Sequence, residues 1–188
     1  MRWRVILGCY VVLLSGALRA DVLEALVERK GLAGQFTQEI ISPEDEVLER
    51  SSGGFALLRP HFFRWEILTP DNQLLLADGE ILTQIDWDLE VVVERQISET
   101  ASSPFQWLLA SRAALDSAFD ISLSGDAAVL ISTDSQSAFQ RLHIEQIAET
   151  VWRLDAEDHG GQLLRVELRE NVDSPPQIAD FAVPPTAF

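Results

Sequence analysis

The side chains that could carry catalytic chemistry are scattered along this sequence. His61, His143 and His159 stand far apart, and none has a spacing such as HxxxH that lets two imidazoles bind one metal ion. The single cysteine, Cys9, cannot build a structural zinc site. The sequence also lacks the GxSxG elbow, the Walker loop and the GxGxxG fingerprint. We therefore expect no catalytic residue, no metal and no cofactor.

Two further patterns look like sites only at first glance. Residues 52–54, Ser-Gly-Gly, resemble a phosphate-binding loop, but they enter a predicted strand and not a helix, so a bulge or bent strand is expected. The acidic residues Asp86 and Asp88, or 44–46, could serve a hydrolase or bind calcium. In a chain with 30 acidic residues such pairs arise by chance, and the DxDxDG calcium loop is absent. We interpret them as solvated loop charge.

A cluster of arginines and aromatic rings at residues 59–65 is the most informative segment. Alternation along a strand places Phe63 and Trp65 on one face of a sheet and Arg64 on the other. The rings predict core packing, and Arg64 fits the surface. Arg59 precedes the proline that opens the strand and lies beside an apolar interior. Its five N–H donors need several acceptors there, so Arg59 is the candidate functional side chain.

Composition narrows the class of protein that must position these residues. The chain has 188 residues, 47% of them hydrophobic, which suits one globular domain. Its formal net charge is −16 and its pI is near 4.4. Phosphate backbones and anionic membrane surfaces would repel such a chain, so we expect no nucleic-acid partner and no membrane docking through basic residues.

The first twenty residues have the layout of a secretory signal peptide. Arg2 and Arg4 form a positive start, the apolar segment 5–14 follows, and small residues lead to Ala17 and Ala20. We predict cleavage after Ala20, with Ala17 as the alternative. Residues 1–20 are then the signal peptide and residues 21–188 a single domain.

Cleavage also removes the only cysteine, so the mature chain would have no thiol and no disulfide. The eleven basic and thirty acidic residues that remain give a formal net charge of −19. Small and apolar residues precede Cys9, as in a lipoprotein signal, but the apolar segment continues beyond it. Lipidation of Cys9 is therefore kept as an alternative.

The rest of the sequence predicts one helix followed by many short strands. Asp21 is the predicted N-cap of the first helix, and Gly31 or Gly34 its end. A second helical region begins at residues 103–104, Ser-Pro. The tail holds at most one more short strand. The strands expected from two-residue alternation are 35–41, 47–58, 62–68, 74–77, 81–86, 90–97, 119–123, 128–132, 139–146, 150–155 and 163–169.

Ten or eleven short strands with two helical interruptions favour a large antiparallel meander sheet or barrel. Several strands are apolar on both faces, as at residues 74–76 and 91–93, and therefore need cover on both sides. A sheet of this size must curl, and the helices are the available cover. The predicted class is thus mainly β with a few helices, a curled sheet that can enclose an apolar cavity.

Several short motifs resemble those of a known family, the periplasmic outer-membrane lipoprotein carriers of the LolA family. They cover most of the mature chain and are Gly34-Gln35-Phe36-Thr37-Gln38, Gly53-Gly54-Phe55, Arg59-Pro60-x-x-Phe63-x-Trp65, Pro70, Asp78-Gly79, Asp86, Leu89-Glu90, Pro104, Leu108-Leu109 and Phe181-x-x-Pro184-Pro185. The resemblance implies an unclosed half-barrel of eleven strands capped by a helical lid. That architecture agrees with the one reached from the strand pattern.

The resemblance also implies a function without chemistry. Such carriers accept an acylated lipoprotein from an inner-membrane transporter, shield its acyl chains in a cavity, and deliver it to an outer-membrane acceptor. The arginine of the RP motif bonds the lid in this family, which makes Arg59 the expected lid latch. We expect the acyl-chain cavity to be formed by Phe36, Phe55, Phe63, Trp65 and Leu108.

The expected protein is a monomer in the periplasm. Two alternatives stay open at this point: a carrier of the same fold for another lipid or glycolipid, and a lipidated outer-membrane acceptor that keeps Cys9 as its N-terminus. A hydrolase that uses an acidic pair is a third, and no motif supports it.

Overall fold

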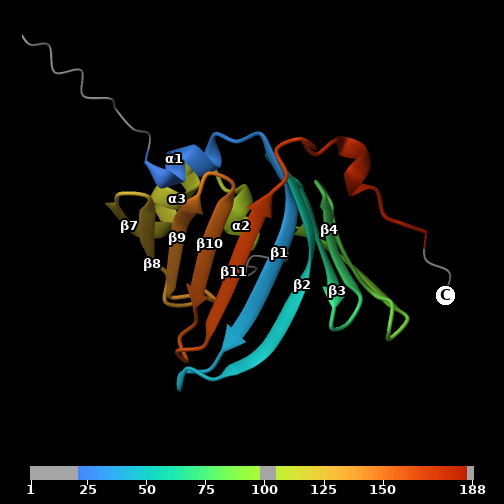
Figure 1. The fold of residues 1–188 in the computed structure, drawn as a ribbon, viewed down its shortest axis with the longest axis horizontal. Helices are drawn as coiled ribbons and strands as arrows, with labels where there is room; N and C mark the ends of the chain where they lie inside the picture. The colour runs from blue at the N-terminus through green and yellow to red at the C-terminus, as the bar shows by residue number, and fades with distance from the viewer. Residues whose placement is uncertain (1–20, 98–104, 186–188) are drawn as a thin grey trace, which may run out of the picture.

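One curled antiparallel sheet dominates the molecule (Figure 1). The structure is a computed structural model that describes residues 21–97 and 105–185, so the predicted signal peptide and the predicted helix start at 103–104 lie outside it. Its strands follow the order β6-β5-β4-β3-β2-β1-β11-β10-β9-β8-β7. They are β1 Gly31–Ile41, β2 Val47–Leu58, β3 Phe62–Thr69, β4 Gln73–Asp78, β5 Ile81–Asp86, β6 Val91–Gln96, β7 Phe119–Ser124, β8 Ala127–Ser132, β9 Arg141–Ala148, β10 Val151–Glu157 and β11 Leu163–Glu170.

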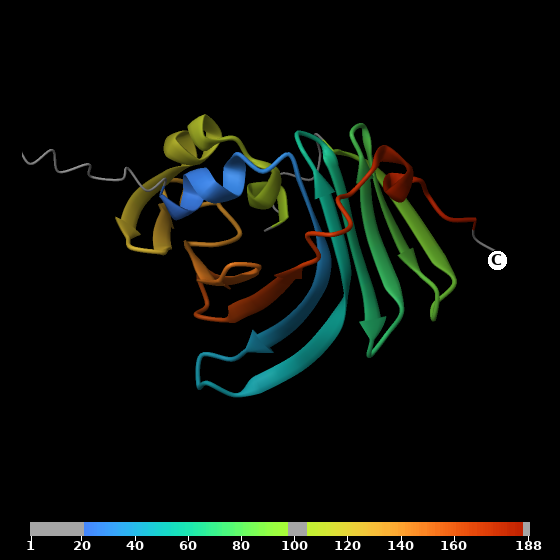
Figure 2. The same ribbon diagram turned by 45° about the horizontal axis from the view of Figure 1, so that its top comes forward.

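The sheet is open, because β6 and β7 are its two end strands and do not pair with each other. Each strand pairs with its neighbour in the sequence, except that β1 pairs with β11 and so joins the two halves of the chain. Figure 2 shows the resulting half-barrel, with helices inside its curve. This confirms the predicted fold class, a mainly β half-barrel of eleven strands with a few helices.

Three short helices cover the concave face of the sheet: α1 Val22–Val27, α2 Phe105–Leu109 and α3 Arg112–Ala118. Leu23, Leu108 and Leu115 place their buried side chains in one core with apolar residues of the strands. Burial of side chains of this size stabilises the folded state by about 1.5–3 kcal/mol each. Among the helices in the described ranges, none is long and apolar enough to cross a membrane.

The first helix begins as predicted and ends earlier than predicted. The Asp21 carboxylate caps it by accepting a hydrogen bond of 2.8 Å from the backbone N–H of Glu24. The prediction that Gly31 or Gly34 ends the helix is wrong, because the helix stops at Val27 and both glycines belong to β1. A Cβ at Gly34 would lie 1.9 Å from the carbonyl oxygen of Arg169, so this glycine permits close pairing with β11.

A register shift between Ser52 and Gly53 confirms the bend predicted for residues 52–54. A Cβ at Gly53 would lie 1.8 Å from the carbonyl oxygen of Glu66, so this position requires glycine.

The alternation predicted for β3 is also confirmed. Phe63 and Trp65 are buried in the core, whereas Phe62 and Arg64 face the convex side. There the tail forms the 3₁₀ helix η2, Ile178–Phe181, in place of a strand. Phe62 lies against Phe181 with ring centroids 5.4 Å apart, and Arg64 donates to the Asp180 carbonyl at 3.3 Å.

Candidate functional site

Arg59 lies just beyond β2, where the sheet meets the ends of two helices. Its side chain is half-buried and donates three hydrogen bonds: Nε to the Arg29 carbonyl at 3.0 Å, Nη2 to the Leu26 carbonyl at 3.1 Å, and Nη1 to the Ala110 carbonyl at 3.3 Å. Leu26 belongs to α1, Arg29 follows it, and Ala110 follows α2. One guanidinium therefore connects the sheet to the C-terminal ends of two helices.

The guanidinium of Arg59 and the carbonyl groups at the helix ends are chemically complementary. The last carbonyls of a helix lack partners within the helix and carry partial negative charge, so a cation is favourable there. Burial lowers the pKa of Arg59 from its ordinary value, because desolvation disfavours the charged form. The three hydrogen bonds that its side chain donates go to neutral carbonyls, which water can satisfy once the contact breaks.

A second contact joins the end of α1 to the sheet. Arg29 forms an ion pair with Glu170 of β11, although the two residues are 141 positions apart. The Glu170 side chain is only 7% exposed, and its Oε2 atom has no hydrogen-bond partner in the described part of the chain. A buried carboxylate depends strongly on its cation, so this pair should hold α1 firmly against β11.

Arg112 ties α3 to α1. Its Nη1 atom lies 2.7 Å from Asp21 Oδ2 and 3.6 Å from Glu24 Oε2, while its Nε binds Asp116 at 2.9 Å. Burial by itself raises the pKa of Asp21, but hydrogen bonds from Arg112 and from the backbone N–H of Glu24 outweigh it, so this pKa is lowered. Hydrogen bonds to Asp21 and Asp116 raise the pKa of Arg112. The helices are thus linked to each other as well as to the sheet, and we call α1, α2 and α3 the lid.

Four of the five residues predicted to form the cavity are aromatic and lie together on β1, β2 and β3. Phe36 stacks on Trp65 with ring centroids 3.6 Å apart, and Phe55 and Phe63 flank Trp65 at 6.2 and 6.1 Å. All four are buried in the core on the concave face, where they pack against one another.

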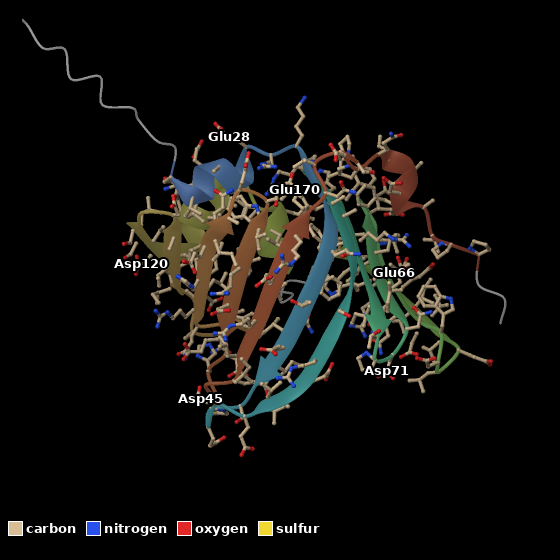
Figure 3. All side chains as sticks on the ribbon, in the orientation of Figure 1. Glu28, Asp45, Glu66, Asp71, Asp120 and Glu170 are labelled. Atoms are coloured by element: carbon tan, nitrogen blue, oxygen red, sulfur yellow. The ribbon has the colours of Figure 1, made fainter. Side chains whose placement is uncertain are left out.

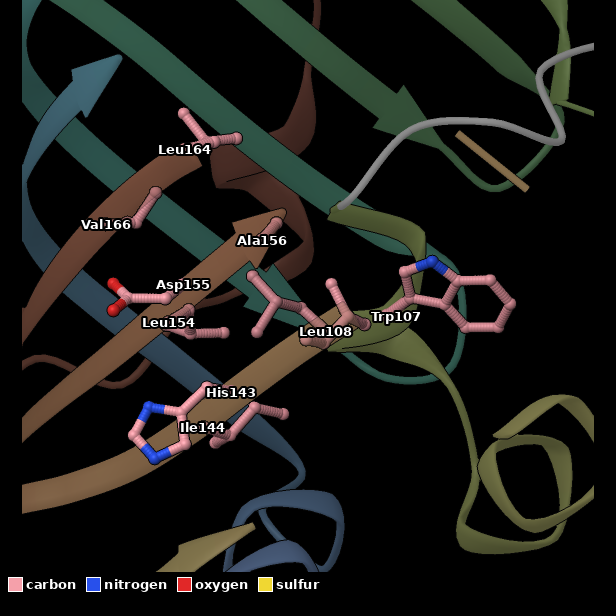
Figure 4. Close-up of a pocket in the computed structure, with 10 residues that line it drawn as sticks. Trp107, Leu108, His143, Ile144, Leu154, Asp155, Ala156, Leu164 and Val166 are labelled. Carbon is pink, nitrogen blue, oxygen red and sulfur yellow. The ribbon is translucent and has the colours of Figure 1, made fainter. Parts of the chain in front are cut away.

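The fifth residue, Leu108, lines an apolar pocket between α2 and the strands β9, β10 and β11 (Figure 4). The pocket is small with the helices in this position: its cavity volume is about 40 Å³, well below that of small-ligand sites, and it is partly open to solvent. The polar ends of His143 and Asp155 point away from Leu108 in Figure 4. The lining consists of Trp107, Leu108, Leu142, His143, Ile144, Leu154, Asp155, Ala156, Leu164 and Val166.

Sequence reasoning missed most of this lining. The family motifs are dense in the first half of the chain, whereas the pocket walls come from β9 to β11. A signal was available, because apolar residues two positions apart mark one face of each strand, as in Leu154 with Ala156 and Leu164 with Val166. In the described part of the chain, no group of three or more His, Cys, Asp or Glu side chains is arranged to hold a metal ion.

Comparison with known proteins decides the family. The family described as outer membrane lipoprotein carrier protein LolA matches residues 28–182 of this chain. The chain belongs to the LolA family. The match begins just after α1 and ends after η2, so it covers the whole LolA-type sheet, Arg59, the pocket, α2 and α3.

Individual relatives carry the same name. An outer-membrane lipoprotein carrier protein of Halorhodospira halophila is 32% identical over 165 residues, which are 85% of this chain and 79% of the relative. The carrier of Aliivibrio salmonicida is 32% identical over 130 residues, 69% of this chain, and the chain spans 65% of that relative's length. A carrier of Xanthomonas oryzae is 45% identical over 94 residues, 50% of this chain and 44% of the relative.

Proposed function

We propose that this LolA-family chain is a periplasmic carrier, and not an enzyme, that shields the acyl chains of lipoproteins and moves them from the inner to the outer membrane. The observation that carries this proposal is the apolar pocket beneath α2. Each CH₂ group sheltered from water is worth about 0.8 kcal/mol, so a chain of about twelve such groups would gain about 10 kcal/mol once the helices move apart and enlarge this pocket. No reactive group is needed for that task, since the cargo is held by burial alone.

Opening and closing of the lid would make binding of the cargo reversible. Shelter and release are different states, and a ligand changes their balance only by binding one state better than the other. We propose that Arg59 is the latch of the closed, empty state, because it bonds both α1 and the residue after α2, and α2 covers the pocket. Phe36, Phe55, Phe63 and Trp65 would extend the acyl-binding surface when the lid opens, next to the pocket that Leu108 already lines.

Export is part of the same proposal. Residues 1–20 would direct the chain to the periplasm and be cleaved after Ala20. The mass of the purified mature protein tests this: an N-terminus at Asp21 or Leu18 agrees with it, whereas a retained Met1 contradicts it. An acylated Cys9 at the N-terminus would favour the lipidated acceptor.

The binding test uses the mature chain and a diacylated lipopeptide, followed by native mass spectrometry and by displacement of a fluorescent fatty acid. We expect a complex with the lipopeptide at micromolar concentration. Ala156→Phe should weaken it at least tenfold by filling the pocket, and Ala148→Phe, at an exposed end of β9, should not. Binding of a glycolipid but not the lipopeptide would favour the carrier of another lipid, and no binding of any amphiphile would contradict a carrier.

A further inference from the structure

Two turns at the end of the sheet opposite α1 are fastened together into one unit (Figure 1). The Trp87 N–H donates to the Asn72 carbonyl at 3.1 Å, and the Asn72 N–H donates to Asp88 Oδ2 at 2.8 Å. Asp86 holds the second turn from inside, since its Oδ1 accepts from the Leu89 N–H at 2.9 Å. We call residues 68–72 and 86–92 the anionic tip.

This unit presents large apolar side chains to solvent. Leu68 is 59% exposed and Leu89 72%, and the adjoining Val91 and Val92 are 43% and 41% exposed. Both valines belong to β6, an end strand of the described sheet, and they point to its opposite faces because they are neighbours along the strand. Exposed leucines scattered over a surface need no explanation, but Leu68 and Leu89 lie on two turns that are hydrogen-bonded to each other.

Acidic residues predominate in the two turns themselves. Residues 65–94 contain eight acidic residues and no lysine or arginine. Asp71, Asp88 and Glu90 are exposed on the tip itself, and Figure 3 labels Asp71 at its turn. Three arginines of the neighbouring strands line a hollow with Thr69, and each is paired: Arg50 with Glu39 at 2.8 Å, Arg165 with Asp155 at 3.0 Å and Arg153 with Glu167 at 3.8 Å. The tip therefore presents exposed apolar side chains together with unneutralised carboxylates.

We propose that the anionic tip is a docking surface for a protein partner whose own surface combines apolar side chains with lysine and arginine. An anionic lipid surface would be repelled by the carboxylates of the tip. A second copy of the chain would bring two acidic tips together, which like-charge repulsion disfavours. A basic protein surface matches both features, because the aliphatic side chains supply affinity and the charges speed association.

The position of the tip separates docking from cargo handling. Arg59 and α1 lie at the other end of the sheet, so a partner held at the tip leaves the lid free to open (Figure 1). The choice of binding partners for the test rests on the proposed carrier function, whereas the surface itself follows from exposure and charge.

The experiment measures binding of the mature chain to the purified inner-membrane lipoprotein transporter and outer-membrane acceptor of the same bacterium, each immobilised in detergent. The variant Leu68→Ser/Leu89→Ser removes the two exposed leucines, and Asp71→Asn/Glu90→Gln reduces the charge. Leu48→Ser is the matched control, because Leu48 is 60% exposed and lies on β2. Displacement of a fluorescent fatty acid from every variant reports cargo binding separately.

We expect Leu68→Ser/Leu89→Ser to weaken binding to at least one partner by tenfold or more, with fatty-acid binding unchanged. Asp71→Asn/Glu90→Gln should slow association and reduce its dependence on salt, and Leu48→Ser should behave as wild type. Wild-type affinity of the leucine variant for both partners would overturn the proposal, as would a wild-type chain that binds neither. Binding of the tip to vesicles of phosphatidylglycerol, or dimerisation lost in the leucine variant, would also overturn it. A wild-type chain that binds no fatty acid would instead contradict the proposed carrier function.

Discussion

Arg59 is a half-buried cation whose side-chain bonds go to three backbone carbonyls. The sequence pointed to this residue because an arginine before a strand-opening proline, beside apolar residues, requires several acceptors. The acceptors themselves could not be predicted, since Leu26, Arg29 and Ala110 come from segments far from Arg59 in the chain. The Arg29–Glu170 pair was missed for the same reason, because 141 positions separate two ordinary charged residues.

The latch is tested by Arg59→Leu. If Arg59 stabilises the closed, empty state, removing it lowers the free energy of opening, so acyl chains bind more tightly and leave more slowly. We expect fatty-acid affinity to rise about tenfold, or about 1.4 kcal/mol, which is less than the roughly 1.5–3 kcal/mol of one hydrogen bond to a charged group. The rate of lipopeptide transfer to the acceptor should fall, while the melting temperature changes by a few degrees.

Arg59→Lys should give an intermediate rate, because an ammonium keeps the charge and loses the planar set of donors. Arg50→Leu is the control, since the Arg50 side chain is 70% exposed on β2. An Arg59→Leu protein that is unfolded, or that binds and transfers like wild type, would leave Arg59 without a latch role.

At the scale of elements, the strands follow from the sequence more closely than the helices do. The predicted strands 47–58 and 81–86 match β2 and β5 residue for residue, because two-residue alternation between clear turns defines both ends. The first helix is shorter than predicted. Gly31 and Gly34, which were predicted to end it, pair with β2 as part of β1, and Gly34 also pairs with β11. Long-range pairing of this kind overrides local propensity.

The glycines of β1 and β2 allow a test of how closely the strands must approach. Gly34→Ala and Gly53→Ala would each place a Cβ very close to a backbone carbonyl oxygen, at 1.9 and 1.8 Å. The strands must then separate, and we expect the free energy of unfolding in urea to fall by about 2 kcal/mol or more. Gly54→Ala is the control, because its nearest neighbour is 3.8 Å away, and it should change stability by less than about 0.5 kcal/mol. Equal effects at Gly34 and Gly54 would contradict this packing.

The contact between α1 and α3 can be followed through the titration of Asp21. Its pKa in the folded protein lies below the ordinary value of 3.8, so its contribution to stability is present above pH 3.8. That contribution is lost as the pH falls through the lowered pKa. In Arg112→Met the hydrogen bond from Arg112 is gone, and the pKa of Asp21 should rise.

Carboxyl carbon NMR measures the pKa of Asp21 in the wild type and in Arg112→Met. Asp78 is the internal control, because the backbone N–H groups of Ile81 and Glu80 lower its pKa and the Arg112→Met change does not reach them. An Asp21 that titrates at the same pH in both proteins would show that Arg112 does not connect the two helices in solution.

For the whole molecule, strand spacing and composition were enough to predict a large curled sheet with helical cover, and the family resemblance implied that this sheet is unclosed. They were not enough to locate the pocket, because its walls combine α2 with three strands from the other end of the chain. The aromatic residues chosen from the motifs, such as Phe36 and Trp65, pack against each other in the core beside this pocket, and their role in acyl-chain binding stays a prediction. Which apolar residues fill space and which leave a hollow depends on packing in three dimensions, which alternation alone does not encode.

The central claim is that the pocket beneath α2 holds an acyl chain, and photolabelling tests it most directly. The mature chain would be loaded with a fatty acid that carries a diazirine near its methyl end, irradiated, digested and sequenced by mass spectrometry. We predict label on peptides that contain Trp107 and Leu108 and on those from β10 and β11, with the label lost in Ala156→Phe and kept in Ala148→Phe. Label confined to the anionic tip or to the convex face, or an undiminished label in Ala156→Phe, would contradict the account.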